Sequence, residues 1–195
     1  MQFIIETSAR HVHLDREAMD VLFGKDAELT HKKDLSQPGQ YASEERVTVV
    51  GPKREIASVT VIGPLRSRTQ VELSATDARN LGIAAPLRES GDVEGSAGCK
   101  LIGPEGELTI REGVIVAKRH LHMTPEDAAA LGVEDGEMVW VLCRSAERPT
   151  ILGDVKCRVS EQYRLAMHVD TDEANAIGMA AGGMGEIVRI TLQNP

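Results

Sequence analysis

The chain has 195 residues, of which 30 are acidic and 22 are basic, so its net charge at pH 7 is −8. This length suits one large domain or two small ones. The negative charge argues against nucleic acid as a partner, because binding to phosphate groups requires a basic surface. No apolar run approaches the ~20 residues that cross a bilayer, so we expect no membrane association.

Short β-branched runs predict strands along most of the chain. The residues before His11 have the composition of a strand. Further strands are predicted at Arg46–Val50, Ile56–Ile62, Gly113–Ala117, Glu137–Cys143 and Glu186–Leu192. Gly-Pro or Asp-Gly turns bound several of these runs. Many short strands with few short helices favour barrels over a doubly wound sheet.

One pattern occurs four times and predicts a short helix each time. Each copy begins with His or Glu, an apolar residue, and then Ser, Thr or Asp. An acidic residue and an alanine follow, and Leu or Ile near a Gly ends the copy. Ser, Thr and Asp suit helix N-caps. The predicted caps are Asp15, Ser74, Thr124 and Asp170.

Further residues of the pattern predict how these helices are closed. An acidic residue lies three positions after three of the caps, as in a capping box. These residues are Asp77, Asp127 and Glu173. Glycine then ends the helix, because it adopts the left-handed conformation that follows a last turn. The predicted stops are Gly82, Gly132 and Gly178.

The four strand–helix units divide naturally into two pairs. The loosest stretch, rich in Gly and Ser, is residues 88–98. We therefore predict a mainly β fold with short helices (α+β), in which two small closed β-barrels are each capped by short helices. The first barrel domain is expected at residues 1–95 and the second at residues 96–195, and exchange of chain between the barrels is left open.

Cysteine usage bears on the cellular compartment. The chain has three cysteines, an odd number, and no CxxC pair. This pattern is typical of a reduced, cytoplasmic protein without a disulfide framework. Cys99, Cys143 and Cys157 are interpreted as small buried hydrophobic residues.

Five of the six histidines lie in the repeated pattern, and four of them form two HxH pairs. Side chains alternate along a strand, so both histidines of a pair face the same way and can grip one cation. Neutral imidazole is a common ligand of zinc. In every copy the last candidate ligand precedes the N-cap by two residues. The candidate metal ligands are His11, His13, Glu72, His120, His122 and His168.

The number of candidate ligands favours two metal ions. A catalytic metal keeps an open position and does not need six protein ligands. Two ions with about three protein ligands each fit better. Spacing alone leaves open which residue binds which ion.

Arg66 is the candidate anion-binding residue. It follows a Gly-Pro turn and lies six residues before Glu72. A guanidinium group suits a bidentate hold on phosphate or carboxylate. Arg68 has the same parity and would face the same way on a regular strand. Lys118 and Arg119, before the second HxH, are interpreted as a basic strand end.

Three segments carry a family resemblance. They are Ser8–Leu14, Gly63–Glu72 and Ala117–Met123, which hold the two HxH pairs and the Gly-Pro-x-Arg block. Together they resemble the phosphate propanoyltransferases of bacterial microcompartments, and the likeness covers nearly the whole chain. The resemblance implies two β-barrels with a di-zinc site between them. It also implies a homodimer and transfer of a short acyl group between coenzyme A and phosphate.

The resemblance assigns roles to residues of this chain. The six candidate ligands become the zinc ligands, and Arg66 becomes the phosphate-binding residue of the catalytic site. The substrates are then acyl-CoA and phosphate, or acyl phosphate in reverse. Members in microcompartments often carry an amphipathic targeting helix before the first HxH, whereas a strand is predicted here. We therefore expect a cytoplasmic enzyme, with the microcompartment lumen and contact with its shell as the second expectation.

The residues suggest one mechanism and two alternatives. With metals to polarise the thioester carbonyl and Arg66 to hold phosphate, we expect direct attack by phosphate. No Ser–His–Asp or Cys–His arrangement is evident, so no acyl-enzyme is predicted. One alternative is a dinuclear metal hydrolase that acts on an ester or phosphate. The other is a non-catalytic module in which structural metal ions link the two barrels.

Overall fold

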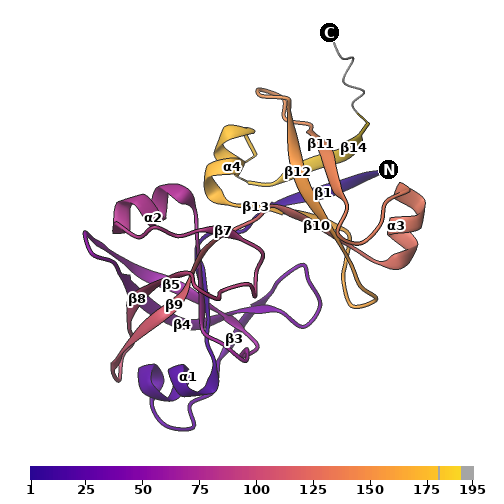
Figure 1. The fold of residues 1–195 in the computed structure, drawn as a ribbon. Coiled ribbons are helices and arrows are strands. Elements are labelled where there is room, and N and C mark those ends of the chain that lie inside the picture. Colours follow the sequence, from indigo (N-terminus) through magenta and orange to yellow (C-terminus); the bar gives the residue numbers. More distant parts are fainter. Residues whose placement is uncertain (180, 190–195) are drawn as a thin grey trace. The chain divides into compact units, whose positions relative to one another are not determined.

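The computed structural model describes residues 1–179 and 181–189, and its strands form two barrels. The first barrel comprises residues 9–117, and the second comprises residues 1–8 together with the described residues from 118 onward. This architecture of short strands and few short helices confirms the predicted fold class (Figure 1).

The first barrel contains eight strands and two helices. They are β2 (His11–His13), α1 (Arg16–Phe23), β3 (His31–Asp34), β4 (Tyr41–Val50), β5 (Glu55–Gly63), β6 (Gln70–Leu73), α2 (Ala75–Leu81), β7 (Leu87–Arg88), β8 (Ala97–Ile102) and β9 (Glu107–Ala117). Six of these strands close a ring in the order β4-β5-β2-β6-β9-β8, because β8 pairs with both β4 and β9. β3 and β7 are attached to β4 and β9 outside this ring.

The second barrel repeats the same ring. Its elements are β1 (Gln2–Thr7), β10 (His120–Met123), α3 (Pro125–Leu131), β11 (Met138–Cys143), β12 (Thr150–Val159), β13 (Ala166–Val169), α4 (Thr171–Ala176) and β14 (Gly183–Val188). The ring order is β11-β12-β10-β13-β1-β14. Each pair of neighbouring strands in this ring has the same relative direction as the equivalent pair in the first barrel. For example, β2 is antiparallel to β6, which carries Glu72, and β10 is antiparallel to β13, which carries His168.

The domain boundary predicted at residue 95 differs from the division in the structure. β8 and β9 follow that point but complete the first barrel, through pairs with β4 and β6. β1 pairs with β13 and β14 and completes the second barrel, so the strand before each HxH belongs to the opposite barrel (Figure 1). The loose stretch near residue 95 is a loop inside the first barrel, where Ser96 accepts a hydrogen bond from the Gly113 backbone N–H. Its Gly and Ser content reflects tight turns rather than a linker.

The four predicted N-caps are confirmed. Each cap side chain accepts a hydrogen bond from a backbone N–H in the first turn of its helix. The capping box is reciprocal in α3 and α4. In α2 the predicted box is replaced, because the Asp77 carboxylate accepts a hydrogen bond from Arg10 Nε at 2.8 Å. Gly82 and Gly132 adopt left-handed φ values of 78° and 67°, which end α2 and α3 as expected.

The five predicted strands are found at β4, β5, β9, β11 and β14. Three of these strands, β4, β5 and β9, are longer than their β-branched runs, because pairing with neighbouring strands continues into the flanking residues. The prediction for Glu186–Leu192 is met as far as Val188, where β14 ends. Positions 190–192 of that run lie outside the described residues.

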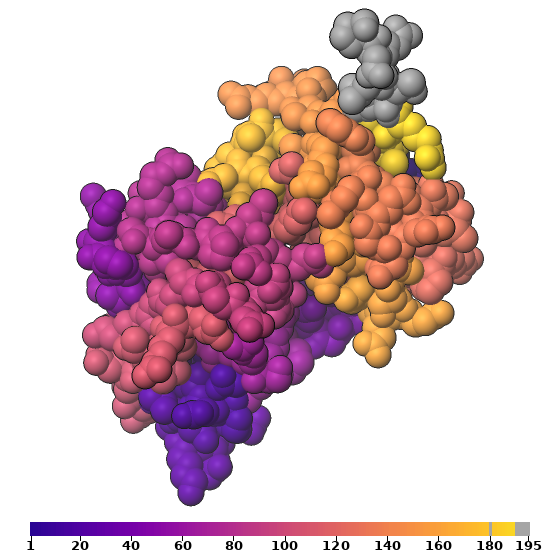
Figure 2. All heavy atoms as spheres, viewed as in Figure 1, coloured from indigo at the N-terminus to yellow at the C-terminus, as the bar shows by residue number. Residues whose placement is uncertain are grey.

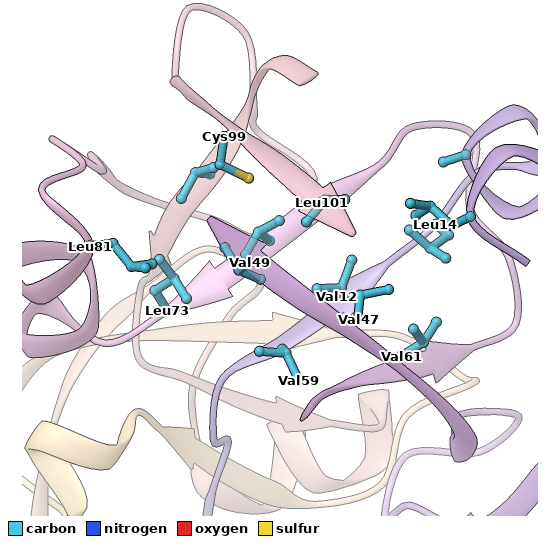
Figure 3. Packing of buried hydrophobic residues seen from close by; sticks show 14 of the residues in the cluster. Val12, Leu14, Val47, Val49, Val59, Val61, Leu73, Leu81, Cys99 and Leu101 are labelled. Atoms are coloured by element: carbon cyan, nitrogen blue, oxygen red, sulfur yellow. The ribbon is translucent and has the colours of Figure 1, made fainter. Parts of the chain in front are cut away.

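Alternation along the ligand-bearing strands separates core from candidate ligands. Val12 packs in the core of the first barrel together with Val47 and Val61 (Figure 3). Leu121 takes the same place in the second core. Full burial of such a side chain stabilises the fold by about 1.5–3 kcal/mol. Because these residues point into the cores, the histidines on either side of them point out of the barrels.

Charged residues on the segment that follows α1 are exposed to solvent. Figure 2 shows α1 and the following segment, in indigo, at the surface of the first barrel, where Lys25, Asp26 and Glu28 are exposed. No helix in the described part of the chain combines the length and the apolar character needed to cross a membrane.

We predict that the three cysteines of the folded protein react slowly with iodoacetamide at neutral pH. All three are free and buried, and burial raises the pKa of Cys99 to about 12 and those of Cys143 and Cys157 to about 11. The thiolate is the reactive form, so alkylation should be roughly tenfold or more slower than in urea-unfolded protein. Intact-mass spectrometry over time measures the adducts. Equal rates for folded and unfolded protein would contradict the predicted burial.

Candidate metal centre

The first HxH pair faces a carboxylate on the neighbouring strand. His11 and His13 extend from β2 with ring centroids 4.9 Å apart. In the antiparallel pairing of β2 and β6, His11 lies opposite Glu72. Glu72 Oε2 is 3.5 Å from His11 Nε2, and Oε1 is 3.9 Å from His13 Nε2. We call these three buried residues the Glu72 cluster; one ligand atom from each lies within 4.8 Å of the others.

The second HxH pair faces a histidine at the equivalent register position. His120 on β10 lies opposite His168 on β13. The ring centroid of His168 is 5.3 Å from that of His120 and 5.1 Å from that of His122. We call these three residues the His168 cluster. Glu6 on β1 adds a carboxylate whose Oε2 is 3.8 Å from His168 Nε2.

The same backbone contact orients one histidine of each cluster. His11 Nδ1 lies 2.8 Å from the carbonyl oxygen of Ala9, and His120 Nδ1 lies 2.8 Å from that of Lys118. A carbonyl can only accept, so Nδ1 is assigned as the N–H donor in both rings. This tautomer leaves the Nε2 lone pair for a metal ion, which is the usual support of a metal-binding histidine.

Electrostatics set the protonation states of the Glu72 cluster. Burial raises the pKa of Glu72, but the charges of His11 and His13 outweigh this and hold it well below its usual range. Burial lowers the pKa of His11, but the Glu72 carboxylate reverses the shift and leaves it raised. Burial, His11 and Arg66 lower the pKa of His13 to about 3. At neutral pH, therefore, Glu72 is ionised and His13 is neutral, as metal binding requires.

The His168 cluster contains a histidine whose polar atoms are unsatisfied. Within the described part of the chain, neither ring nitrogen of His122 has a hydrogen-bond partner, although both atoms are buried. Such a loss costs about 1–3 kcal/mol per group. Burial, together with the neighbouring His120 and His168, lowers the pKa of His122 to about 2, so the ring is neutral. A divalent ion would satisfy the ring, and imidazole with carboxylate is a donor set that suits zinc.

Arg66 is connected to the Glu72 cluster through one hydroxyl group. Its backbone N–H donates to the Leu14 carbonyl at 2.8 Å, and its Nη1 donates to Ser90 Oγ at 3.0 Å. Ser90 in turn donates to Glu72 Oε1 at 2.7 Å. The structure therefore brings Arg66 beside the Glu72 cluster, in a segment that is not the regular strand on which the parity argument depended.

The other basic candidates make structural contacts. Arg68 forms an ion pair with Glu112 and is half exposed. The expected shared parity with Arg66 fails because the segment between β5 and β6 is irregular rather than a strand. Arg119 donates to Glu173 at 2.6 Å, just as Arg10 donates to Asp77 in the first barrel. This agrees with the interpretation of a basic strand end.

Sequence reasoning missed two polar residues beside Glu72. Gln70 is two positions from Glu72 on β6, so alternation could have placed it on the same face. Its amide lies within hydrogen-bond distance of Glu72. Ser90 lies in the loop between β7 and β8, within the loose stretch of residues 88–98. The sequence did not place this loop beside Glu72, because only the fold carries it there.

Comparison with known proteins gives one consistent result. A family model described as phosphate propanoyltransferase matches residues 4–180. Proteins named phosphate propanoyltransferase are similar over nearly their full length. The protein of Listeria monocytogenes is 51% identical over 187 residues, covering 96% of this chain and 87% of its own. That of Leptotrichia buccalis is 53% identical over 185 residues, covering 95% and 87%. That of Citrobacter freundii is 54% identical over 171 residues, covering 88% and 81%.

We predict that loss of one imidazole lowers the metal content of the purified protein. His11→Ala and His122→Ala each remove a donor from one cluster, so retained zinc per chain should fall below that of the unaltered protein. Elemental analysis after gel filtration measures it. His31→Ala is the matched control, because His31 is exposed on β3 and lies outside both clusters. Equal zinc content in all four proteins would argue against ligand roles for His11 and His122.

Proposed function

Because the chain belongs to the phosphate propanoyltransferase family, we propose that it exchanges a short acyl group between coenzyme A and inorganic phosphate. The reaction is acyl-CoA + phosphate = acyl phosphate + CoA. One observation of the structure carries the proposal: a single hydroxyl group joins the Glu72 cluster to Arg66. A donor set of a kind that suits a metal ion therefore lies beside a guanidinium group suited to phosphate.

We propose that the Glu72 and His168 clusters together hold two zinc ions. Neutral rings at His13 and His122 and the unsatisfied nitrogens of His122 support this proposal. Bound zinc would supply Lewis acidity toward the thioester carbonyl and the phosphate oxygens, and would favour departure of the thiolate.

Arg66 would bind phosphate and orient it for attack. Its guanidinium carries a permanent positive charge, and the hydrogen bond from Nη1 to Ser90 restricts the rotation of the group. The hydrogen bond from the Arg66 backbone N–H to the Leu14 carbonyl holds the backbone from which the side chain extends. Orientation of a nucleophile beside its target can contribute up to roughly 7–11 kcal/mol to lowering a barrier.

The acyl group would pass directly from sulfur to phosphate. A phosphate oxygen attacks the thioester carbon, the carbon–sulfur bond breaks, and CoA leaves as its thiolate. The chain's own thiols are poor candidates for an intermediate, because burial raises the pKa of all three cysteines to about 11 or 12. A buried protonated thiol is a weak nucleophile.

The central prediction is that thiol release from propanoyl-CoA depends on phosphate. Arg66→Ala should raise the KM for phosphate at least tenfold and leave the KM for propanoyl-CoA nearly unchanged, because only phosphate loses its guanidinium partner. Steady-state thiol-release assays measure both constants. Arg68→Ala is the control, since Arg68 pairs with Glu112 at the surface. Equal rises in both constants for Arg66→Ala would count against the phosphate role.

The same assay separates the two alternatives. Thiol release without phosphate and without acyl phosphate would favour a dinuclear hydrolase. Absence of turnover by the zinc-loaded protein, with unfolding on chelation, would favour a module in which metals only staple the barrels.

A second prediction concerns the reaction intermediate. Rapid quenching during turnover with radiolabelled propanoyl-CoA should leave no label on the protein, because the transfer is direct. Peptide mapping should focus on Ser90, whose hydroxyl is the one nearest to Glu72 in the network. A labelled side chain that forms and decays at the rate of turnover would overturn direct attack.

Two other expectations concern assembly and location. Family membership favours a homodimer, whereas cysteine usage and the strand predicted before His11 favour a cytoplasmic location, with the lumen of a microcompartment as the second expectation. Both stay predictions for this chain.

A further inference from the structure

Gln70 is a buried amide that faces the Glu72 cluster. It lies on β6, opposite His13 of β2 and two residues before Glu72, and its side chain is almost completely buried. Alternation along the strand puts it on the face that carries Glu72. A buried amide must satisfy both N–H donors and its oxygen, so its contacts reveal its role.

The amide of Gln70 is held in one orientation. Nε2 donates to Glu72 Oε1 at 2.6 Å and to Ser90 Oγ at 3.0 Å. Oε1 accepts from the backbone N–H of Gly91 at 2.7 Å. The reversed amide would set its oxygen against the Glu72 carboxylate and its NH2 group against an N–H donor. Gln70 therefore ties β6 to the loop that carries Ser90.

The hydroxyl group of Ser90 is used to its full capacity. It donates its one proton to Glu72 Oε1 and accepts from Gln70 Nε2 and from Arg66 Nη1. A hydroxyl group has one donor and two acceptor positions, and all three are taken. Ser90 Oγ thus connects the Arg66 guanidinium to both Glu72 and Gln70.

The network distinguishes the two oxygens of Glu72. Oε1 accepts hydrogen bonds from both Gln70 and Ser90, whereas Oε2 lies 3.5 Å from His11 Nε2. Oε2 is therefore the oxygen presented to a metal ion. In the second barrel, Ala166 occupies the register position of Gln70, opposite His122. The amide therefore accompanies the carboxylate, whereas an alanine holds the equivalent register position two residues before His168.

We propose that Gln70 is a positioning residue with two targets. It holds Glu72 so that Oε2 binds metal, and through Ser90 it holds Arg66 so that the guanidinium meets phosphate. The second part rests on the proposed function; the first requires only that the Glu72 cluster binds metal. Metal retention and phosphate binding are thereby linked through one amide.

Three variants of the holoenzyme test the proposal. Gln70→Met keeps an unbranched side chain of similar size and removes all three hydrogen bonds. Ser90→Ala removes the link to Arg66. Ser96→Ala is the matched control, because Ser96 is a buried serine of the same barrel. Among the described residues, its hydroxyl group donates to the Val93 carbonyl and accepts from the Gly113 backbone N–H, and both contacts lie outside the Glu72 network.

The first readout is metal affinity, measured by competition with a chelator. Gln70→Met should bind zinc roughly 10- to 100-fold more weakly, the usual effect of losing a group that orients a ligand. The cobalt-substituted variant should show an altered visible absorption spectrum. Ser96→Ala should match the unaltered protein in both. Unchanged affinity and an unchanged spectrum in Gln70→Met would overturn the proposal.

The second readout is the KM for phosphate, measured at saturating zinc. It should rise severalfold in Gln70→Met and in Ser90→Ala, with little change in the KM for propanoyl-CoA. If Gln70→Met does not fold, the smaller Ser90→Ala change still decides, and an unchanged KM for phosphate there would refute the link to Arg66. If the unaltered protein shows no phosphate-dependent turnover, the proposed function fails, while the affinity measurement still decides the role of Gln70.

Discussion

The antiparallel pairing of each HxH strand with the strand of a third ligand is the constraint on which the candidate centre depends. The register sets His11 against Glu72 in one barrel and His120 against His168 in the other. Because side chains alternate along a strand, a register shift of one residue would turn Glu72 or His168 into the barrel core and expose an apolar side chain on the outer face. Val12 and Leu121, which pack in the two cores, hold the register in place.

The repeated ring gives two barrels the same scaffold with different chemistry. In the Glu72 cluster a carboxylate stabilises positive charge on His11 and is itself stabilised by hydrogen bonds from Gln70 and Ser90. In the His168 cluster three imidazoles meet, and burial with mutual repulsion keeps His122 neutral. The two barrels thus share equivalent register positions, and the clusters differ because two of these positions hold different residues, Glu72 or His168 at one and Gln70 or Ala166 at the other.

Exchange of strands between the barrels, which the sequence left open, explains why the boundary expected at residue 95 differs from the division in the structure. β1 and β9 each precede an HxH strand along the chain, yet each completes the other barrel. Composition marks turns and loops, but it carries no information on which barrel a strand joins. The Gly- and Ser-rich stretch near residue 95 therefore suggested a linker, although hydrogen bonds of Ser96 fix it inside the first barrel.

The sequence by itself determined the features that depend on neighbours along the chain. The four N-caps, the common direction of the histidines in each HxH and the repeat with its candidate ligands all follow from local geometry. Only the tertiary structure decided the partners of Asp77, Arg68 and Ser90, because those contacts join segments far apart in sequence. Such contacts depend on strand pairing and loop paths, which no periodicity within a single segment encodes.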